Sequence, residues 1–286
     1  MADEKKLVLE ASDVSIIFGG LCAVSEFSCE LREGGLYGLI GPNGAGKTTL
    51  FNMISGIYTP TSGQLSFWDK NGKVRIINKM KPAGLNTIGI ARTFQNIRLF
   101  GNLSVSDNVR IALHSSRTVS PLDVLLRTPK FRRDEKMMSE RAMHLLRLFK
   151  IDGKKDSLAR NLPYGEQRKL EICRALAANP LLLLLDEPES HLDFKNQFRI
   201  LRLIKSLVTE RGISCLMNTH FPDYALRLSD SSLLMGKGKS VFGPTRDLIN
   251  AENIRDYFGV ETEVIRVPDR DMETLVILEK LEEQTG

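Results

Sequence analysis

An apolar segment runs directly into a glycine-rich loop in Leu36-Tyr37-Gly38-Leu39-Ile40-Gly41-Pro42-Asn43-Gly44-Ala45-Gly46-Lys47-Thr48. Residues 41–48 match the pattern G-x-x-x-x-G-K-[ST] at every fixed position. Residues 36–40 have the length and composition of a buried strand, and residues 48–54 have the spacing of a helix that ends near Gly56. Glycines let successive N–H groups point inward, and a helix N-terminus adds its positive end. The stretch therefore predicts a site for phosphate groups.

This loop predicts which residues hold a nucleoside triphosphate and its metal ion. Lys47 is expected to reach the β and γ phosphates, and the Thr48 hydroxyl to bind Mg²⁺. A chance match in an ordinary turn is disfavoured because the strand and helix contexts are both correct. The remaining predicted nucleotide-binding residues of the loop are Gly41, Pro42, Asn43, Gly44, Ala45, Gly46 and Thr49.

A second run of apolar residues supplies the acidic groups that such a site needs. Residues 181–185 are five consecutive leucines, typical of a buried strand, and Asp186 and Glu187 follow them directly. Open α/β sheets bind ligands at the carboxyl ends of their strands. We therefore expect Asp186 to hold Mg²⁺ through water and Glu187 to polarise the water that attacks the γ-phosphate. Asp186 and Glu187 could instead be an ordinary strand end that meets solvent. The presence of the phosphate loop favours the catalytic role.

The order of the predicted elements indicates one α/β domain with a helical insertion. Residues 7–40 and 57–94 have the texture of strands and turns, whereas residues 104–150 are predicted to be mostly helical. Within the latter, one helical stripe comprises Met138, Ala142, Leu145, Leu146 and Phe149. A further strand over 213–217 follows a helix over 196–208. Strands that alternate with helices predict a largely parallel sheet covered by helices.

Composition excludes several classes of protein. The 286 residues are 42% hydrophobic and 26% charged, which is typical of globular domains rather than disordered or fibrous chains. The net charge of +5 is small, and the one basic cluster, residues 130–133, is followed at once by two acidic residues, so we expect no nucleic-acid partner. The four cysteines lack metal-ligand spacing and indicate free thiols. No apolar segment approaches the ~18–20 residues of a membrane span, so any link to a membrane is expected to run through a partner.

Further motifs resemble one family. Leu162-Pro163-Tyr164-Gly165-Glu166 is similar to the signature loop of ABC-transporter ATPases, and the motifs over about residues 7–260 occur in that family's order. The resemblance implies a P-loop NTPase of the ABC type, with a mixed β subdomain, an α/β core and a helical subdomain at about 96–165. Residues 261–286 lie beyond the resemblance, and their apolar residues among charges favour a short capping extension over a regulatory domain. The resemblance also implies that Gln95 contacts metal and water, that His220 contacts the γ-phosphate and that Phe18 stacks on adenine.

The resemblance also implies an assembly. Two copies, or this chain and a paralogue, are expected to close head to tail, so that Tyr164, Gly165 and Glu166 of one chain meet the ATP of the other. Two membrane permease subunits would hold this pair at the cytoplasmic face of the inner membrane. An extracytoplasmic substrate-binding protein would deliver cargo to the permease from the opposite side. Pro163 departs from the commoner serine, because proline supplies neither the hydroxyl nor the N–H that would address phosphate.

The two halves of the sequence resemble different branches of the family. Residues 1–185, through Arg92-Thr93-Phe94-Gln95-Asn96 and the tyrosine-glycine-glutamate signature, are similar to ATPases of branched-chain amino acid importers. Residues 186–260, through Thr219-His220-Phe221-Pro222-Asp223, look like ATPases of iron-chelate and cobalamin importers. Because the segment that docks on a permease lies in the first half, uptake of branched-chain amino acids is favoured over an iron chelate, haem or cobalamin.

Two other kinds of ABC protein remain as alternatives. A soluble ABC ATPase of translation or DNA repair usually carries two ATPase domains or a long coiled-coil insertion, and the sequence has neither pattern. A nucleotide-binding regulator without turnover would not need the intact set Lys47, Asp186, Glu187 and His220. The sequence therefore favours a magnesium-dependent transport ATPase.

Overall fold

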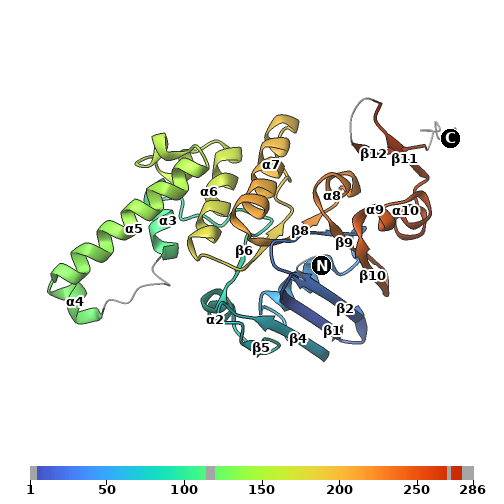
Figure 1. The fold of residues 1–286 in the computed structure, drawn as a ribbon, viewed down its shortest axis with the longest axis horizontal. Helices are drawn as coiled ribbons and strands as arrows, with labels where there is room; N and C mark the ends of the chain where they lie inside the picture. The colour runs from blue at the N-terminus through green and yellow to red at the C-terminus, as the bar shows by residue number, and fades with distance from the viewer. Residues whose placement is uncertain (1–4, 114–119, 269–271, 279–286) are drawn as a thin grey trace.

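A parallel sheet forms the centre of the molecule. The computed structural model describes residues 5–113, 120–268 and 272–278. Its central sheet has the strand order β10-β9-β3-β8-β7-β6 (Figure 1), with β10 antiparallel to β9 and the other neighbours parallel. This confirms the predicted fold class. The strands are β3 (Leu36–Ile40), β6 (Ile90–Arg92), β7 (Leu182–Asp186), β8 (Ser214–Thr219), β9 (Ser231–Gly236) and β10 (Lys239–Pro244).

The register of β3, β8 and β7 brings the predicted motifs to one edge. Ile40 pairs with Thr219, and Asp186 pairs with Asn218, so the three strands end at the same level. Every residue of these strands is buried, which explains why apolar residues predominate in them. The phosphate loop, the acidic pair and His220 consequently leave the sheet side by side.

An antiparallel sheet covers one face of the central sheet. Its order is β2-β1-β4-β5. Leu182, Leu184 and Leu216 of the central sheet share a core with Phe27 of this sheet and with Phe51 of the helix after the phosphate loop. The elements are β1 (Leu7–Phe18), β2 (Leu21–Arg32), β4 (Ser62–Trp68), β5 (Val74–Ile76) and α1 (Lys47–Ile54).

Helices cover the opposite face and extend to one end of the molecule. Leu183, Leu185 and Met217 share a core with the α5 stripe predicted from the sequence, all of which is buried. In Figure 1 the helices α3 to α6 gather at the end opposite the C-terminal hairpin. The elements are α3 (Val105–Leu113), α4 (Pro121–Leu125), α5 (Pro129–Leu148), η2 (Asp152–Lys154), η3 (Ala159–Asn161), α6 (Tyr164–Ala177) and α7 (Phe194–Arg211). No described helix is both long and apolar enough to cross a membrane.

The chain ends in small helices and a hairpin. Three helices, α8 (Pro222–Leu228), α9 (Thr245–Leu248) and α10 (Ala251–Phe258), precede a pair of antiparallel strands, β11 (Thr262–Arg266) and β12 (Glu273–Ile277). The hairpin is tied to α8, because Thr274 Oγ1 donates to Asp223 Oδ1 at 2.8 Å and Leu275 N donates to the same oxygen at 3.3 Å. The last residues of the predicted extension, 279–286, lie outside the described residues.

One element differs from the sequence prediction. Residues 57–94 were expected to form only strands and turns, but α2 (Pro82–Ile88) lies between β5 and β6. Two sequence signals mark this helix: Pro82 in its first turn, and Gly89 after its end with φ of 117°. Such a backbone angle favours glycine, so the pair Pro82 and Gly89 is typical of a short helix.

Candidate functional site

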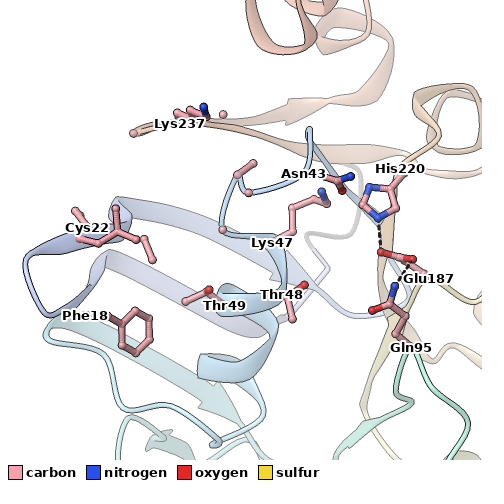
Figure 2. Close-up of a pocket in the computed structure, with 17 residues that line it drawn as sticks. Phe18, Cys22, Asn43, Lys47, Thr48, Thr49, Gln95, Glu187, His220 and Lys237 are labelled. Carbon is pink, nitrogen blue, oxygen red and sulfur yellow. Dashed lines mark hydrogen bonds and ion pairs between the residues drawn. The ribbon is translucent and has the colours of Figure 1, made fainter.

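A cleft of about 730 Å³ opens at the carboxyl edge of β3, β7 and β8. Figure 2 shows Gln95 and His220 on either side of Glu187, across the cleft from Thr48 and Lys47. The structure thus brings together side chains that are far apart in the sequence. The lining residues are Phe18, Leu21, Cys22, Ala23, Asn43, Gly44, Ala45, Gly46, Lys47, Thr48, Thr49, Gln95, Glu187, His220, Gly236, Lys237 and Gly238.

The loop has the backbone conformation that the glycine pattern predicts. Gly46 has φ of 93°, and a Cβ atom there would lie 2.4 Å from the carbonyl oxygen of Ala23. Only glycine fits this position without moving a neighbouring strand. Lys47 Nζ donates to the carbonyl oxygens of Gly41 at 2.6 Å and Pro42 at 3.0 Å. These last two residues do not line the cleft, and their carbonyls hold the lysine instead.

Burial sets the electrostatics of Lys47. Its side chain lies inside the loop, and burial lowers its pKa, while the carboxylates of Glu187 and Asp186 act in the opposite direction. A buried ammonium group that has only backbone carbonyls as partners is well placed to exchange them for phosphate oxygens. Lys47 is therefore a cation that faces a cleft without a close ion pair of its own among the described contacts.

Glu187 has both carboxylate oxygens in use. Gln95 Nε2 donates to Oε2 at 2.9 Å, and His220 Nε2 pairs with Oε1. The Glu187 N–H donates to the carbonyl oxygen of Asn218 at 3.0 Å, and the residue has φ of 46°, in the left-handed region. Non-glycine residues rarely adopt this conformation, so the strand end is held in a costly geometry. The result is an oriented carboxylate rather than a freely rotating one.

Asp186 does not line the cleft. It is buried, forms an ion pair with Arg92 Nη2 at 2.7 Å and accepts a hydrogen bond from Asn218 Nδ2 at 2.8 Å. The Arg92 guanidinium is also held by Asn52 and Ser55, each at 2.7 Å. Arg92 and Asn218 were not among the predicted site residues. The one feature of the sequence that could have indicated them is their position near the carboxyl end of β6 or β8, the two strands that flank β7.

The residues of α6 include a buried ion pair that the sequence analysis did not single out. Arg168 and Glu171 are joined at 2.6 Å, with side chains 0% and 2% exposed. The remaining hydrogen bonds of the Arg168 guanidinium go to the backbone carbonyls of Phe94, Asp186, Glu187 and Pro188, at 2.6 to 3.2 Å. Glu171 accepts from the Phe94 N–H at 3.2 Å. We call Arg168 and Glu171 the α6 clamp, because they hold the backbone beside both Gln95 and Glu187.

The other end of the cleft is more exposed and more apolar. Phe18 lies there, 44% exposed, with its ring edge-to-face against Tyr58 at 5.2 Å between centroids. Cys22 also lines this end, and Lys237 lines the cleft from the turn between β9 and β10 (Figure 2). An exposed aromatic ring at the rim provides a surface on which a planar base can stack. Cys22 and Lys237 carried no motif by which the sequence analysis could have found them.

The predicted signature residues form a separate group. Tyr164, Gly165 and Glu166 begin α6 and do not line the cleft of their own chain. Tyr164 packs edge-to-face against His191, with 6.0 Å between ring centroids, and Glu166 pairs with Lys154 Nζ at 2.6 Å. The predicted site residues therefore fall into three groups: those that line the cleft, those that lie beside it (Gly41, Pro42 and Asp186), and those at the start of α6.

The donor set fits a magnesium ion that is held mainly by a ligand. No group of three or more His, Cys, Asp or Glu side chains in the described ranges forms a metal cage. Mg²⁺ usually keeps waters and substrate phosphates and takes only one or two protein ligands. Thr48 and Gln95 present oxygen-bearing side chains to the cleft, and Asp186 lies behind them. These residues suit a metal–phosphate complex rather than a metal held by protein alone.

A phosphate-binding loop that faces a glutamine, a glutamate and a histidine at the carboxyl edge of a parallel sheet defines a P-loop nucleotide-hydrolysing protein. The model of the ABC transporter family matches residues 24–190. The chain belongs to the ABC transporter family, as the sequence motifs predicted, and is an ATPase of that family that binds ATP.

Relatives of known transport role match almost the whole chain. The chain is 34% identical to LivG of Salmonella typhimurium, a high-affinity branched-chain amino acid transport ATP-binding protein, over 88% of this chain and 98% of LivG. BraF of Pseudomonas aeruginosa, which has the same description, matches with the same identity and coverage. An alignment over 88% of the chain must cross residue 186, so likeness to this branch continues into the second half.

Solved structures agree with the fold. The ADP conformation of MJ1267, an ATP-binding cassette of an ABC transporter, is 28% identical, with a TM-score of 0.74 over 88% of this chain and 97% of that one. A metal-chelate type ABC transporter in an inward-facing conformation has a TM-score of 0.79 over 96% of this chain and 99% of that one, at 22% identity. The second likeness concerns the fold alone.

Replacing Lys47 by alanine is expected to weaken ATP binding roughly 10- to 100-fold, because a charge-assisted contact to phosphate is worth about 1.5–3 kcal/mol. Fluorescent-nucleotide titration measures the effect. Lys79→Ala, which removes an exposed lysine outside the cleft, is the matched control. Equal affinities of Lys47→Ala and the unmodified protein would remove Lys47 from the phosphate site.

Proposed function

We propose that this chain is the ATP-hydrolysing subunit of an importer that energises uptake of branched-chain amino acids through separate permease subunits. The observation that supports branched-chain amino acids as the cargo is the match to LivG and BraF across 98% of each relative's length. We assign residues 7–260 to the ATPase domain, with a helical subdomain at about 96–165, and 261–286 to a C-terminal extension.

The geometry supports a division of roles within the cleft. Lys47 and the loop N–H groups would hold the phosphates, and Phe18 would stack on the adenine. Glu187 would accept a proton from the attacking water, while Gln95 and His220 orient that water and the γ-phosphate. Thr48, Gln95 and Asp186 would hold Mg²⁺, which when bound neutralises charge on the β and γ phosphates.

This assignment uses hydrogen-bonding capacity that the present contacts leave over. Each carboxylate oxygen of Glu187 has one partner, Gln95 or His220, so each keeps a lone pair that could accept from water. Among the described contacts, Lys47 uses two of its three ammonium donors on the carbonyls of Gly41 and Pro42, so its third donor is free for phosphate. We propose that ATP and a second chain would exchange some of these contacts and so convert this arrangement into an active one.

The second chain follows from the two separate groups of site residues. Tyr164, Gly165 and Glu166 do not line the cleft of their own chain, so they would meet ATP only on another molecule. The N-terminus of α6 lies at this point and presents backbone N–H groups suited to phosphate. Pro163, as the N-cap residue, adds no side-chain hydrogen bond. We propose a head-to-tail pair, formed by two copies or by this chain and a paralogue.

A smaller groove is proposed as the permease-docking site. It has a volume of about 260 Å³ between α2, α3 and α6, and its walls include Ile111, Arg174, Arg92 and Glu171. Arg92 and Glu171 also belong to the hydrogen-bond system around Asp186 and Phe94. A cytoplasmic helix of a permease seated here would thus touch residues that reach the catalytic edge. Such docking would place the chain at the cytoplasmic face of the inner membrane, with a substrate-binding protein on the other side.

The test is co-purification and reconstitution with candidate permeases. We expect this chain to bind amino-acid-type permeases and to show cargo-dependent ATPase activity with them. Ile111→Asp should abolish the stimulation, because it places a charge in the groove, while Leu125→Asp, at an exposed position on α4, should not.

Three outcomes would contradict part of the proposal. Selective binding to iron-chelate, haem or cobalamin permeases would mean that the cargo belongs to one of these classes, as the resemblance of residues 186–260 would suggest. Strong activity with no response to any permease would favour a soluble ABC ATPase. The absence of hydrolysis despite ATP binding would favour a regulator.

A further inference from the structure

Glu189 is a buried carboxyl group close to the proposed catalytic base. It lies two residues after Glu187 and is 1% exposed. Its Oε1 accepts the Thr219 hydroxyl, while Oε2 has no hydrogen-bond partner among the described residues. A buried carboxyl with one oxygen unsatisfied is costly and rare, so its presence beside the site calls for a physical reason.

Thr219 connects this carboxyl to the segment that carries His220. The Thr219 side chain is fully buried, and its Oγ1 accepts the N–H of Phe221 at 3.1 Å while it donates to Glu189. A hydroxyl has one proton to donate and lone pairs to accept, so both bonds form together. His220 lies between the two anchored residues, and its Nε2 pairs with Glu187.

We propose that Glu189 and Thr219 are positioning residues that hold the His220 ring against Glu187. The inference rests on the proposed function, in which His220 and Glu187 act on the γ-phosphate and the attacking water. Glu189 touches neither the cleft nor its ligands. It acts through the Thr219 hydroxyl, which fixes the backbone on both sides of the histidine.

The surroundings of Glu189 also make this support sensitive to pH. Burial raises the pKa of Glu189 to about 7, and the charge of Glu187 acts in the same direction, whereas the Thr219 hydrogen bond and Arg168 oppose it. Tyr224 of α8 also faces this carboxyl, and its pKa is raised mainly by burial and further by Glu189. Near neutral pH, Glu189 is therefore present in both protonation states.

The sign of the effect follows from linkage. The folded state favours protonated Glu189, so the associated stability is complete below the ordinary pKa of 4.5 and is lost as pH rises to about 7. Once ionised, Glu189 adds a negative charge near Glu187, whose own charge opposes that ionisation. Glutamine at this position would keep the hydrogen bond to Thr219 and remove the charge.

The first experiment compares two substitutions at Thr219. Thr219→Val is isosteric but lacks the hydroxyl that bonds both Glu189 and the Phe221 N–H. It should lower kcat about 3- to 10-fold, an effect in the range expected for lost hydrogen bonds, with KM for ATP unchanged. Thr219→Ser restores the hydroxyl and should restore kcat. Thermal unfolding and nucleotide titration establish that each variant is folded. Native kcat for Thr219→Val would overturn the proposal.

The second experiment uses the pH profile, which a merely structural role would not move. The kcat of Glu189→Gln should change less between about pH 4.5 and pH 7 than the kcat of the unmodified protein, because the charge of Glu189 no longer develops in that range. The thermal unfolding midpoint of Glu189→Gln should equal that of the unmodified protein near pH 4.5 and exceed it increasingly towards pH 7. Glu210→Gln, at an exposed position on α7, is the control. Superimposable profiles for Glu189→Gln and the unmodified protein would overturn the pH-sensitive role.

The Glu187→Gln variant separates failure of this inference from failure of the proposed function. If Glu187→Gln loses hydrolysis and the Thr219 and Glu189 variants behave natively, only the positioning inference is wrong. If Glu187→Gln also hydrolyses ATP at the native rate, the assigned chemistry itself is wrong.

Discussion

Replacing Glu187 by glutamine is expected to lower ATP turnover about 10²- to 10⁴-fold while ATP still binds, because an amide cannot accept the proton of the attacking water. The substitution preserves the shape of the side chain. Its carbonyl oxygen can still accept from Gln95 Nε2, which donates to Glu187 Oε2 at 2.9 Å. The phosphate loop, on the opposite wall of the cleft, is left unchanged.

Single-turnover hydrolysis measures the loss of turnover, and nucleotide titration of the same preparation measures whether ATP still binds. Glu252→Gln removes an exposed carboxylate on α10 and serves as the control for a loss of one negative charge. Hydrolysis at the native rate by Glu187→Gln would exclude this residue as the base. A loss of ATP binding instead would assign it to the nucleotide-binding set.

The second large effect is expected from the α6 clamp. Arg168→Met should lower the free energy of unfolding by about 3–5 kcal/mol, because it leaves Glu171 buried and uncompensated. The backbone carbonyls of Asp186, Glu187 and Pro188 would lose their donor at the same time. Hydrolysis should therefore decline even at temperatures where the variant remains folded.

Urea denaturation, followed by circular dichroism, measures this loss. The double variant Arg168→Met with Glu171→Leu should recover part of the stability, since no buried charge remains. Lys239→Met breaks an exposed ion pair with Asp256 and should change stability by about 1 kcal/mol or less. Arg168→Met with native stability would mean that the pair and its carbonyl contacts contribute little.

Local patterns were enough to predict the centre of the site. The phosphate loop, the acidic pair after a leucine run and the histidine after a third strand each occupy a few consecutive residues. Parallel strands then bring such segments to one edge of the sheet without further information. For this reason local patterns predict that Lys47 and Glu187 share one site, whereas the role of His220 was predicted from the resemblance to ABC-transporter ATPases.

Long-range partners were beyond the reach of these patterns. The spacing of Arg168 and Glu171 indicates that they share one face of a helix, but not that this face meets four backbone carbonyls. The pairing of Arg92 with Asp186 spans 94 residues. Nothing in the sequence singles out Glu189, because its burial depends on the packing of the whole chain. These contacts depend on how segments far apart in the sequence pack against one another. The sequence of one segment alone does not contain that information.

The α6 clamp connects the beginning of helix α6 rigidly to the backbone that carries Glu187. Tyr164 begins α6, and Arg168, one turn later, is bonded to the main chain around Glu187. In the proposed pair, the beginning of this helix contacts the nucleotide of the neighbouring chain. Binding or release of that nucleotide would therefore move Glu187 of the chain that contains the helix. Coupling of this kind is reciprocal. Nucleotide binding at one site of such a pair would then change the position of Glu187 in the chain that contributes its α6 to that site. The two sites would therefore respond to each other's occupancy.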